Sequence, residues 1–506
     1  MPILNSFISW IIKKRIHQID LFRKYPDEVQ MECFKNLIYS AKDTEWGRKY
    51  NYSSINSVRD FKNRVPVQDY ESFKPYIDRL KKGEQNLLWH SDIKFFAKSS
   101  GTTNDKSKYI PVSQEALEEC HYKCGKDMLS IHCNNFEETQ IFTGKSLMLG
   151  GSNQLNEFRE ASYYGDLSAI ILQNMPLWAQ LFRSPDLSIS LMDKWEEKIE
   201  KMAQATVKEN ITNIAGVPSW TMVLAKRVLE ISGKKNLSEV WPNLELFMHG
   251  GVSFVPYRKQ FKKLIPSSQM NYLEIYNASE GFFGIEDIPH SDELLLMLDY
   301  GIYYEFLPMD ELENKYPKAL SLDEVRLNIN YALVISTNAG LWRYLIGDTI
   351  KFTSLYPFRI KITGRTKHFI NAFGEELMVE NAEKALVISC KRTDALVKEF
   401  TAAPIFMEDG KSGGHEWLIE FEKPPENLEY FAEILDNAIK SLNSDYEAKR
   451  YHDFILKMPT VKSLPTGTFY NWLKGKDKLG GQNKVPRLCN DRKYVEEILL
   501  SVMTNS

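Results

Sequence analysis

Apolar positions recur along this chain with two different periods, and each period predicts a different kind of element. Spacings of three and four residues over 193–204 and 219–231 predict amphipathic helices. Short apolar runs over 146–149, 244–248 and 270–276 predict strands around them. Because helices and short strands alternate in this way, the first two-thirds of the chain is expected to form one large α/β domain.

The pattern changes after residue 293, where strand-like runs follow one another without helices between them. These runs cover 294–298, 302–307, 332–336, 341–344 and 359–363. The tripeptide NAG at 338–340 is typical of a tight turn between two of them. This part of the chain is therefore expected to be an antiparallel β subdomain.

A third pattern begins beyond Arg365. The order becomes helix, strand, strand, helix and strand, over 378–388, 396–402, 417–421, 427–442 and 454–458. This order predicts a compact α+β unit of ordinary domain size. We therefore expect a large domain over 1–365 and a small C-terminal domain over 366–506. With 506 residues, of which 43% are hydrophobic, the chain can bury a large core.

Charge and cysteine content narrow the function classes. The 64 Lys and Arg residues nearly balance the 67 Asp and Glu residues, for a formal net charge of -3, so no global attraction to nucleic acid or to an anionic membrane is expected. Any binding of phosphate must therefore be local.

The six cysteines are too sparse and irregular for a disulfide framework in a chain of this length. A reducing compartment, and hence a cytoplasmic location, is expected.

One segment combines cysteines with histidines and has two interpretations. Its residues with metal-ligating atoms are Cys120, His121, Cys124, His132 and Cys133. Their spacing matches no common zinc pattern, and the segment has the pattern of a helix. Packing of buried thiols is therefore the favoured interpretation, and a zinc site is the alternative.

The N-terminal segment is apolar over 2–12 and ends at a basic run. It is too short to span a bilayer and lacks the cleavage site of a secretory signal, so no stable membrane insertion is expected. Phe7, Ile8, Ile11 and Ile12 share one helical face. We expect this face to pack on the large domain, with transient membrane contact as the alternative.

Candidate chemistry begins with the run KSSGTTNDKSK at 98–108, between a short apolar run and a helix start at Ser113. Hydroxyls, a glycine and lysines on a connecting loop suit a polyphosphate, although the usual phosphate-loop spelling does not occur. A solvated polar loop is the alternative interpretation. The candidate phosphate ligands are Ser99, Ser100, Gly101, Thr102, Thr103 and either Lys106 or Lys108.

Three more motifs follow in order. They read YNASEG at 276–281, WRYLIGD at 342–348 and ITGRTK at 362–367. Together with the loop they resemble the acyl-adenylate-forming superfamily. The loop wording and the run GGQNKVPR at 480–487 resemble, more narrowly, the auxin-responsive family of acyl-acid amido synthetases, as a bacterial-type member. The resemblance covers nearly the whole chain.

The resemblance implies a fold, a reaction and two half-reactions. The fold is α/β, with a large N-terminal adenylate-forming domain that contains α/β layers and a β subdomain, and a small mobile α+β C-terminal domain that swivels between the half-reactions. The reaction adenylates a carboxylic acid with ATP and Mg²⁺ and then transfers the acyl group to an amine, expected to be an amino acid. No nucleic-acid partner is implied.

The resemblance also assigns roles to single residues. Glu280 matches the carboxylate that holds Mg²⁺, Asp348 the carboxylate that accepts the ribose hydroxyls, and Lys108 the phosphate-loop cation. Arg365 matches an arginine that reaches ribose or phosphate, and Lys484 a lysine that meets the α-phosphate and the carboxylate during adenylation. The adenine-binding segment is matched by Gly250, Gly251 and Val252, with Tyr276 stacked on the base and Ser279 beside it.

Each of these residues also has a plain structural interpretation. Asp348 suits an ordinary turn, the two glycines suit a bend, and Arg365 suits an ion pair. Tyr163, Tyr164 and Trp220 could flank the acyl group of the acid, but core packing is the default for aromatic side chains.

The segment FGEEL at 373–377 departs from the family pattern, because Glu376 stands where many relatives carry a lysine. This departure motivates one alternative to amide synthesis, in which the chain binds nucleotide without turnover. A second alternative is independent of Glu376: the acyl-adenylate could be passed to coenzyme A or a carrier thiol.

Overall fold

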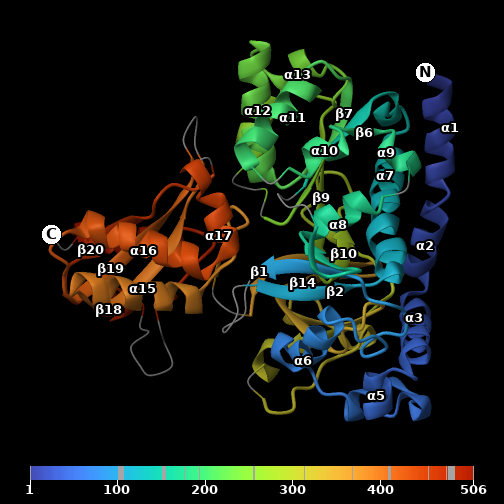
Figure 1. Cartoon of the computed structure of the whole chain (residues 1–506), viewed down its shortest axis with the longest axis horizontal. Coiled ribbons are helices and arrows are strands. Elements are labelled where there is room, and N and C mark those ends of the chain that lie inside the picture. Colours follow the sequence, from blue (N-terminus) through green and yellow to red (C-terminus); the bar gives the residue numbers. More distant parts are fainter. Residues whose placement is uncertain are drawn as a thin grey trace. The chain divides into compact units, whose positions relative to one another are not determined.

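The computed structural model describes residues 2–100, 107–150, 155–175, 177–192, 194–252, 254, 257–312, 314–366, 369–407, 412–453, 455–474, 476 and 485–504. The chain divides into two compact units (Figure 1). The first comprises Met1–Ser99, Lys108–Gly251 and Phe261–Thr366; the second comprises Ser100–Ser107, Val252–Gln260 and Lys367–Ser506. Two short segments from the N-terminal part of the chain thus group with the second unit, which a single cut near Arg365 does not foresee.

A long mixed sheet forms the centre of the first unit. Among the described residues its strand order is β12-β13-β14-β15-β11-β10-β9-β8-β7-β3-β6. The bounds are β3 Lys145–Leu149, β6 Arg183–Ser184, β7 Ile211–Gly216, β8 Leu246–Gly250, β9 Asn271–Ala278, β10 Gly281–Ile285, β11 Leu294–Leu296, β12 Ile302–Pro308, β13 Asn330–Thr337, β14 Tyr344–Leu355 and β15 Phe358–Arg365. Strands β6, β3, β7, β8 and β9 are parallel, and the others pair antiparallel.

The expected β subdomain is not a separate sheet. Strand β10 pairs with β9 on one side and β11 on the other, and β11 pairs with β15, so the antiparallel strands continue the parallel ones. The expected strand over 341–344 was wrong except at its last residue, since β14 begins at Tyr344. The reason is the backbone before it: Gly340 and Arg343 both have positive φ angles, of 86° and 48°, which a strand cannot contain.

Local signals explain where the helices around the sheet begin and end. The expected helices over 193–204 and 219–231 are confirmed as α11 Trp195–Thr206 and α12 Pro218–Ser232. Helix α12 starts with Pro218 in its first turn and ends before Gly233, whose φ of 66° provides the left-handed cap. The remaining helices of this part are α1 Pro2–Lys13, α2 Ile16–Lys24, α3 Pro26–Ala41, α4 Glu45–Lys49, α5 Val58–Arg64, α6 Tyr70–Lys81, α7 Lys123–Asn135, α8 Leu167–Gln173, α9 Leu177–Gln180, α10 Leu187–Ser190, α13 Leu237–Val240 and α14 Arg258–Leu264.

A second, smaller sheet has the order β2-β1-β5-β4. Its strands are β1 Phe95–Ser100, β2 Ser107–Val112, β4 Asn156–Arg159 and β5 Ser162–Gly165. The hydroxyl-rich run therefore connects two strands of one sheet, whereas a strand-to-helix connection was expected. The helix start at Ser113 is confirmed, because its Oγ accepts a 2.9 Å hydrogen bond from the Ala116 N–H.

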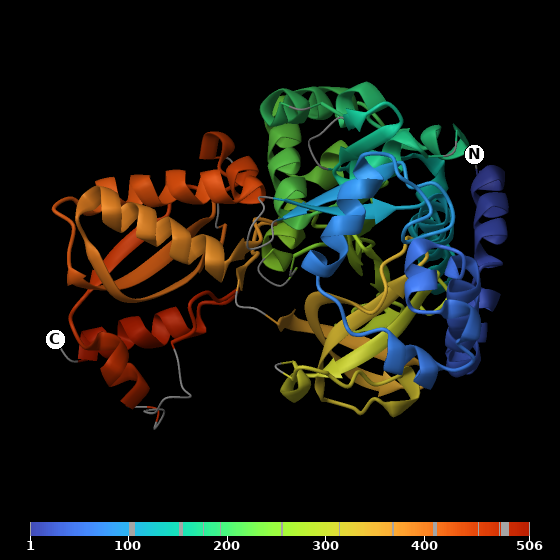
Figure 2. The same ribbon diagram turned by 60° about the horizontal axis from the view of Figure 1, so that its bottom comes forward.

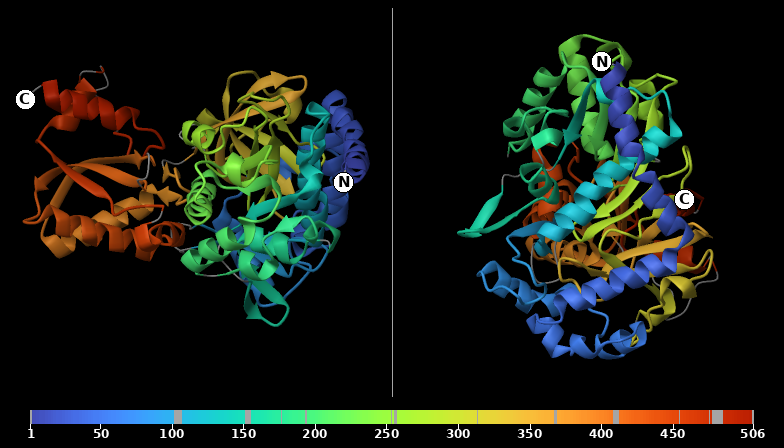
Figure 3. Two further views of the ribbon diagram at one scale, coloured as in Figure 1. Left: turned by 90° about the horizontal axis from the view of Figure 1, so that it is seen from above. Right: turned by 90° about the vertical axis from the view of Figure 1, so that its right-hand side faces the viewer.

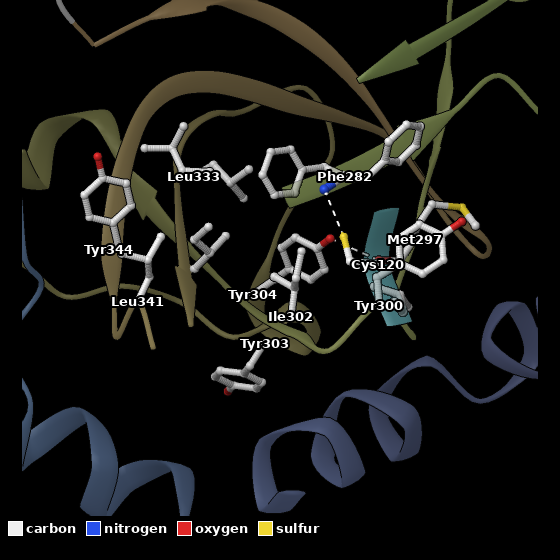
Figure 4. Close-up of a cluster of buried hydrophobic side chains, with 14 of the residues drawn as sticks. Cys120, Phe282, Met297, Tyr300, Ile302, Tyr303, Tyr304, Leu333, Leu341 and Tyr344 are labelled. Atoms are coloured by element: carbon white, nitrogen blue, oxygen red, sulfur yellow. Dashed lines mark hydrogen bonds between the residues drawn. The ribbon is translucent and has the colours of Figure 1, made fainter. Parts of the chain in front are cut away.

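The cysteines of the helical segment lie in the core. Cys120 Sγ accepts a hydrogen bond from the Phe282 N–H at 3.2 Å, among the buried aromatic side chains drawn in Figure 4. Burial raises the pKa of Cys120 to about 12 and that of Cys133 to about 11. Among the described residues no group of three or more His, Cys, Asp or Glu side chains could hold a metal ion.

Helix α1 packs on the domain with only part of the expected face. Ile8 and Ile12 are half-buried, but Phe7 and Ile11, which were also expected to pack, are exposed, while the polar Asn5 is buried. The reason is a pair of hydrogen bonds: the Asn5 side chain donates to the Thr139 carbonyl and accepts from the Phe142 N–H. No helix among the described residues is long and apolar enough to cross a bilayer.

The second unit is a three-layer α+β unit. Strands β18 Leu396–Ile405, β19 Gly414–Lys423 and β20 Thr460–Leu464 form its sheet in that order, and β16 Phe369–Ile370 pairs with β17 Leu377–Met378 beside it. Helices α15 Val379–Thr393, α16 Leu428–Leu442 and α17 Ser444–Lys449 are followed in sequence by α18 Thr468–Lys474 and α19 Lys493–Thr504 (Figure 2). Phe469, Trp472, Val495 and Ile498 pack α18 and α19 against the sheet.

The strand expected over 454–458 was wrong, and the third strand is β20. Ile455 and Leu456 are buried, as their apolar character indicates, but Met458 is exposed and the segment lies in a connection. Leu456 forms one isolated parallel bridge, with Gly413, and donates its own N–H to the Lys449 carbonyl, so the pairing does not extend into a strand. An apolar run thus marks burial more reliably than it marks a strand.

Candidate active site

The sequence motifs meet where the parallel strands of the first unit give way to antiparallel ones. Tyr276 on β9 donates a hydrogen bond of 2.7 Å from its hydroxyl to Asp348 Oδ2 on β14. The other carboxylate oxygen of Asp348 lies 2.8 Å from Arg365 Nε on β15. Strand pairing explains the second contact, because Asp348 and Arg365 are direct partners in the β14–β15 register. One carboxylate is therefore held from two sides by residues 72 and 17 positions away.

Tyr276 has a buried ring and a buried hydroxyl. Its ring centroid lies 4.9 Å from that of Phe283, and only 4% of the residue is exposed. Burial, with the negative charge of Asp348 beside it, raises the pKa of Tyr276 well above its ordinary value. The hydroxyl therefore stays protonated and orients Asp348. The expected stacking of Tyr276 on a base stays a prediction.

Glu280 lies in the turn between β9 and β10, next to Ser279, and both residues are half-buried. Burial raises the pKa of the Glu280 carboxyl, while the nearby Lys108 ammonium opposes this shift. Asp348 raises the same pKa further and Arg365 lowers it, so these charges are close neighbours. Within the described ranges Glu280 forms no ion pair shorter than 4 Å. A partly buried carboxylate of this kind fits a divalent cation with oxygen ligands.

Tyr344 is a further residue of this cluster, and the sequence analysis did not single it out. It is fully buried, and its Oη has no hydrogen bond of ordinary geometry to any described residue. Burial, and then the Glu280 carboxylate, raise the pKa of Tyr344 well above its ordinary value. Figure 4 shows its ring beside Leu341 and Leu333 with the hydroxyl pointing away from them. Its place four residues before Asp348 in the same motif was an available signal.

The phosphate-loop candidates are only partly described. Ser99 is half-buried near the end of β1, and Ser100 is the last residue of that strand. Lys108 lies on β2, with Nζ 5.8 Å from the ring centroid of Tyr70. The remaining candidates fall outside the described residues: Gly101, Thr102, Thr103, Lys106 and Lys484.

Small residues line the carboxyl edge of the parallel strands. Strand β3 is followed by Gly150, β7 ends at Gly216, β8 ends at Gly250 and β9 ends at Ala278. A Cβ atom on Gly250 would lie 2.5 Å from the Ile275 carbonyl oxygen, so this position requires glycine. Ligands of open α/β sheets bind at this edge, outside the carboxyl ends of the strands.

The two-glycine segment continues from β8. Gly251 has a φ of 82°, which favours glycine, and forms the bend that was one interpretation of this segment. Val252 is buried and groups with the second unit.

The acyl-pocket candidates lie on two elements. Tyr163 and Tyr164 are half-buried on β5; Tyr163 stacks on Phe95 with centroids 5.9 Å apart, and Tyr164 stacks on Phe158 at 4.2 Å. Trp220 is half-buried in the first turn of α12, directly after the carboxyl end of β7. Trp220 therefore lies at the edge that also carries Gly250 and Glu280, whereas the tyrosines lie on the small sheet.

This fold is shared with solved enzymes that activate carboxylic acids. An acyl acid amido synthetase, AtGH3.15 in complex with 2,4-DB, superposes with a TM-score of 0.60 at 18% identity, over 94% of this chain and 93% of that chain. A 2-hydroxyisobutyryl-CoA ligase in complex with 2-HIB-AMP and CoA superposes with a TM-score of 0.57 at 13% identity, over 95% and 92%. The expected class is thereby confirmed: a mixed α/β fold with a large N-terminal and a smaller C-terminal domain, like that of adenylating enzymes.

Sequence comparison then gives the family. The chain matches the GH3 family N-terminal domain over residues 15–270, the central domain over 295–365 and the C-terminal domain over 380–493. The chain belongs to the GH3 family, the auxin-responsive family of acyl-acid amido synthetases. Indole-3-acetic acid-amido synthetase GH3.3 of Arabidopsis thaliana is 22% identical over 94% of this chain and 91% of its own length. 4-Substituted benzoates-glutamate ligase GH3.12 of the same plant is 23% identical over 92% and 94%.

Proposed function

We infer that this GH3-family chain is an acyl-acid amido synthetase, a ligase that uses ATP to join a carboxylic acid to an amino acid. In the first half-reaction, a carboxylate oxygen of the acid attacks the α-phosphorus of ATP and pyrophosphate leaves. In the second, the amine nitrogen attacks the acyl carbon, AMP leaves and the nitrogen loses a proton. The observation that carries the proposal is the cluster of Asp348, Tyr276, Arg365 and Glu280 at the carboxyl edge of the sheet.

Asp348 is suited to hold the ribose. Each carboxylate oxygen already has one partner, Tyr276 Oη or Arg365 Nε, and each can accept a second hydrogen bond from a hydroxyl. The two existing contacts fix the plane of the carboxylate before nucleotide arrives. We propose that the 2′- and 3′-hydroxyls of ATP donate to these oxygens. Pre-orientation of this kind lowers the entropic cost of binding.

Glu280 and Lys108 are suited to the phosphates. We propose that Glu280 holds Mg²⁺, which when bound neutralises phosphate charge during adenylation. Lys108 contributes a positive charge from β2, and its proximity opposes the rise in the pKa of Glu280 that burial causes. The hydroxyls of Ser99, Ser100, Thr102 and Thr103, with the backbone at Gly101, are proposed as further phosphate ligands.

Lys484 is proposed to complete the site during adenylation. Only that half-reaction brings a carboxylate against a phosphate and therefore needs an additional cation. Gly250, Gly251 and Val252 are proposed to contact adenine beside Ser279, and Trp220 is proposed to contact the acyl group together with Tyr163 and Tyr164. The bacterial-type membership implied by the sequence stays a prediction.

Coenzyme A is the second candidate acceptor, because the fold is shared with a CoA ligase. Full-length protein supplied with ATP, Mg²⁺ and a panel of acids should release pyrophosphate and transfer labelled oxygen from the carboxylate to AMP. Cleavage of ATP to ADP would refute adenylation. Parallel reactions with amino acids or coenzyme A separate the acceptors, since thioester without amide would overturn amide synthesis. Tight ATP binding without pyrophosphate for any acid would indicate a non-catalytic binder.

The segment with Glu376 motivated the alternative in which the chain binds nucleotide without turnover. Glu376 has a positive φ of 38°, its N–H donates to Asn371 Oδ1, and its carbonyl accepts from the Asn443 side-chain amide. A left-handed residue held by two side-chain hydrogen bonds indicates a loop with a fixed backbone conformation.

We propose a cytoplasmic location, since all six cysteines are free thiols.

A further inference from the structure

Helix α1 leaves three large apolar side chains exposed. Phe7, Trp10 and Ile11 are 56%, 58% and 45% exposed, whereas Asn5 is 3% exposed. Polar contacts help to attach the other side of the helix: Asn5 bonds to the backbone at 139 and 142, and Ser130 Oγ donates to the Ile12 carbonyl at 2.7 Å. The apolar stripe of a surface helix ordinarily faces the core, so an exposed group of this kind needs another explanation.

The exposed residues form one continuous face. Positions 7, 10 and 11 are three or four residues apart and therefore lie on one side of α1, and Lys14 follows directly after the last residue of the helix. The Lys14 ammonium lies over the Trp10 ring, with Nζ 3.8 Å from the ring centroid. Helix α1 lies along the outside of the first unit, next to α7, with its other side uncovered in that unit (Figure 3).

Positive charge flanks this face. Arg15 is occupied by Asp127 and Asp299, but Lys14 and, on α2, Lys24 are exposed. Leu21 on α2 is exposed as well, so apolar and basic side chains continue into the second helix. Asp20 on α2 is exposed too, but it pairs with Arg23, so Lys14 and Lys24 leave these two helices with an excess of positive charge on a chain whose net charge is -3. Local charge of this sign is complementary to anionic lipid.

We propose that α1 is an interfacial helix that docks this protein on an anionic bilayer surface. Phe7, Trp10 and Ile11 enter the boundary between headgroups and acyl chains, and Lys14 and Lys24 contact the anionic headgroups. Trp and Phe beside Lys are the residues that hold helices at this depth. Membrane binding requires no step of the ligase reaction, so it can be tested independently of the proposed function.

The size of the face favours a bilayer over a second copy of the chain. Three partly exposed side chains of this kind offer roughly 300 Å² of apolar surface, whereas each partner of a stable protein interface buries about 800 Å². A bilayer accepts a short helix without shape complementarity. Because α1 has 12 residues, it lies on the membrane and does not span it.

Flotation of the full-length protein with vesicles tests the proposal. We expect binding to vesicles of phosphatidylcholine mixed with phosphatidylglycerol, weaker binding to phosphatidylcholine alone, and release by high salt. The triple variant Phe7→Ser, Trp10→Ser, Ile11→Ser should lose binding, and the double variant Lys14→Glu, Lys24→Glu should weaken it by about ten-fold or more. Tryptophan emission should shift to shorter wavelength on binding, and Trp10→Phe should bind but lose most of that shift.

A control removes three large side chains elsewhere that are more exposed than those of α1. Leu181→Ser, Tyr316→Ser and Tyr356→Ser together change side chains that are 77%, 76% and 75% exposed, and vesicle binding should persist. Absence of vesicle binding, or equal binding by the α1 triple variant, overturns the proposal. A change of oligomeric state in the triple variant without vesicle binding overturns it in favour of a second copy. Circular dichroism of each variant shows whether loss of binding reflects loss of the fold.

Discussion

Replacement of Asp348 by alanine tests the assignment of the nucleotide site most directly. The carboxylate is held by Tyr276 and Arg365 and has acceptor capacity for two hydroxyls. Hydrogen bonds to a charged acceptor are worth about 1.5–3 kcal/mol each. Loss of two at the lower value, about 3 kcal/mol, corresponds to about a hundred-fold weaker binding of ATP.

The measurement is a thermodynamic cycle by calorimetry. Wild type and Asp348→Ala are each titrated with Mg²⁺-ATP and with Mg²⁺-2′,3′-dideoxy-ATP. Wild type should bind the dideoxy nucleotide about a hundred-fold more weakly than ATP, and the variant should bind both with equal, low affinity. Asp292→Ala is the matched control, because that side chain is 73% exposed and 3.7 Å from Lys361.

One result would refute the reasoning. If Asp348→Ala weakens ATP and dideoxy-ATP by the same factor, the carboxylate makes no contact with the ribose hydroxyls. Asp348 would then act on the fold, as the partner that keeps Tyr276 and Arg365 satisfied. If the variant loses affinity for ATP but not for dideoxy-ATP and its thermal midpoint is unchanged, a general effect on the fold is excluded as the cause.

Three further predictions concern the same cluster. Burial raises the pKa of Glu280, so its charge destabilises the fold as pH rises through the raised value. Glu280→Gln should therefore raise the thermal midpoint at neutral pH and lose that advantage below pH 4.5. The same variant should abolish Mg²⁺-dependent release of pyrophosphate. A lower midpoint at neutral pH would contradict this. Tyr344→Phe removes a hydroxyl without a hydrogen bond of ordinary geometry, so the midpoint should not fall, while the Mg²⁺ concentration for half-maximal rate should rise several-fold; an unchanged Mg²⁺ dependence counts against a role beside Glu280. Lys484→Ala should slow acyl-adenylate formation by about 10²-fold or more and spare amide formation from supplied acyl-adenylate, whereas equal losses would indicate a structural residue.

The elements of this fold that depend on local signals were predictable. Helix α12 begins at a proline and ends before a glycine, and its apolar period needs no distant contact to be recognised. The strand expected over 332–336 is confirmed as part of β13, which is apolar over 331–335. The errors occurred where distant parts of the chain decide the structure. Residues 455 and 456 are buried without pairing in a named strand, and α1 buries Asn5, which finds two backbone partners far along the chain, while Phe7 and Ile11 stay exposed.

The site was predictable as a set of residues but not as a geometry. Recognition of motifs selected Tyr276, Glu280, Asp348 and Arg365, which the fold brings together. Their pairing depends on strand register and on which strands are neighbours, and neither is encoded within a short window. The continuation of the parallel strands into the antiparallel ones through β10 and β11 is a property of the whole sheet. Tyr344 lies four residues before Asp348 in the same motif, but its burial beside the Glu280 carboxylate depends on the whole fold and could not be predicted from that position.

The glycines at the ends of the parallel strands set how this protein can diversify. A side chain at position 250 would collide with the neighbouring strand, and one at 216 would lie 3.0 Å from Thr221 Oγ1. Substitutions at these positions therefore damage the scaffold before they alter a ligand. Trp220 follows the strand end on α12, where a change of side chain leaves strand pairing intact. Under the proposed assignment of Trp220 to the acyl group, selection for a new acid would act on such positions on helices, and substrate preference could change while the strand ends proposed to bind nucleotide stay the same.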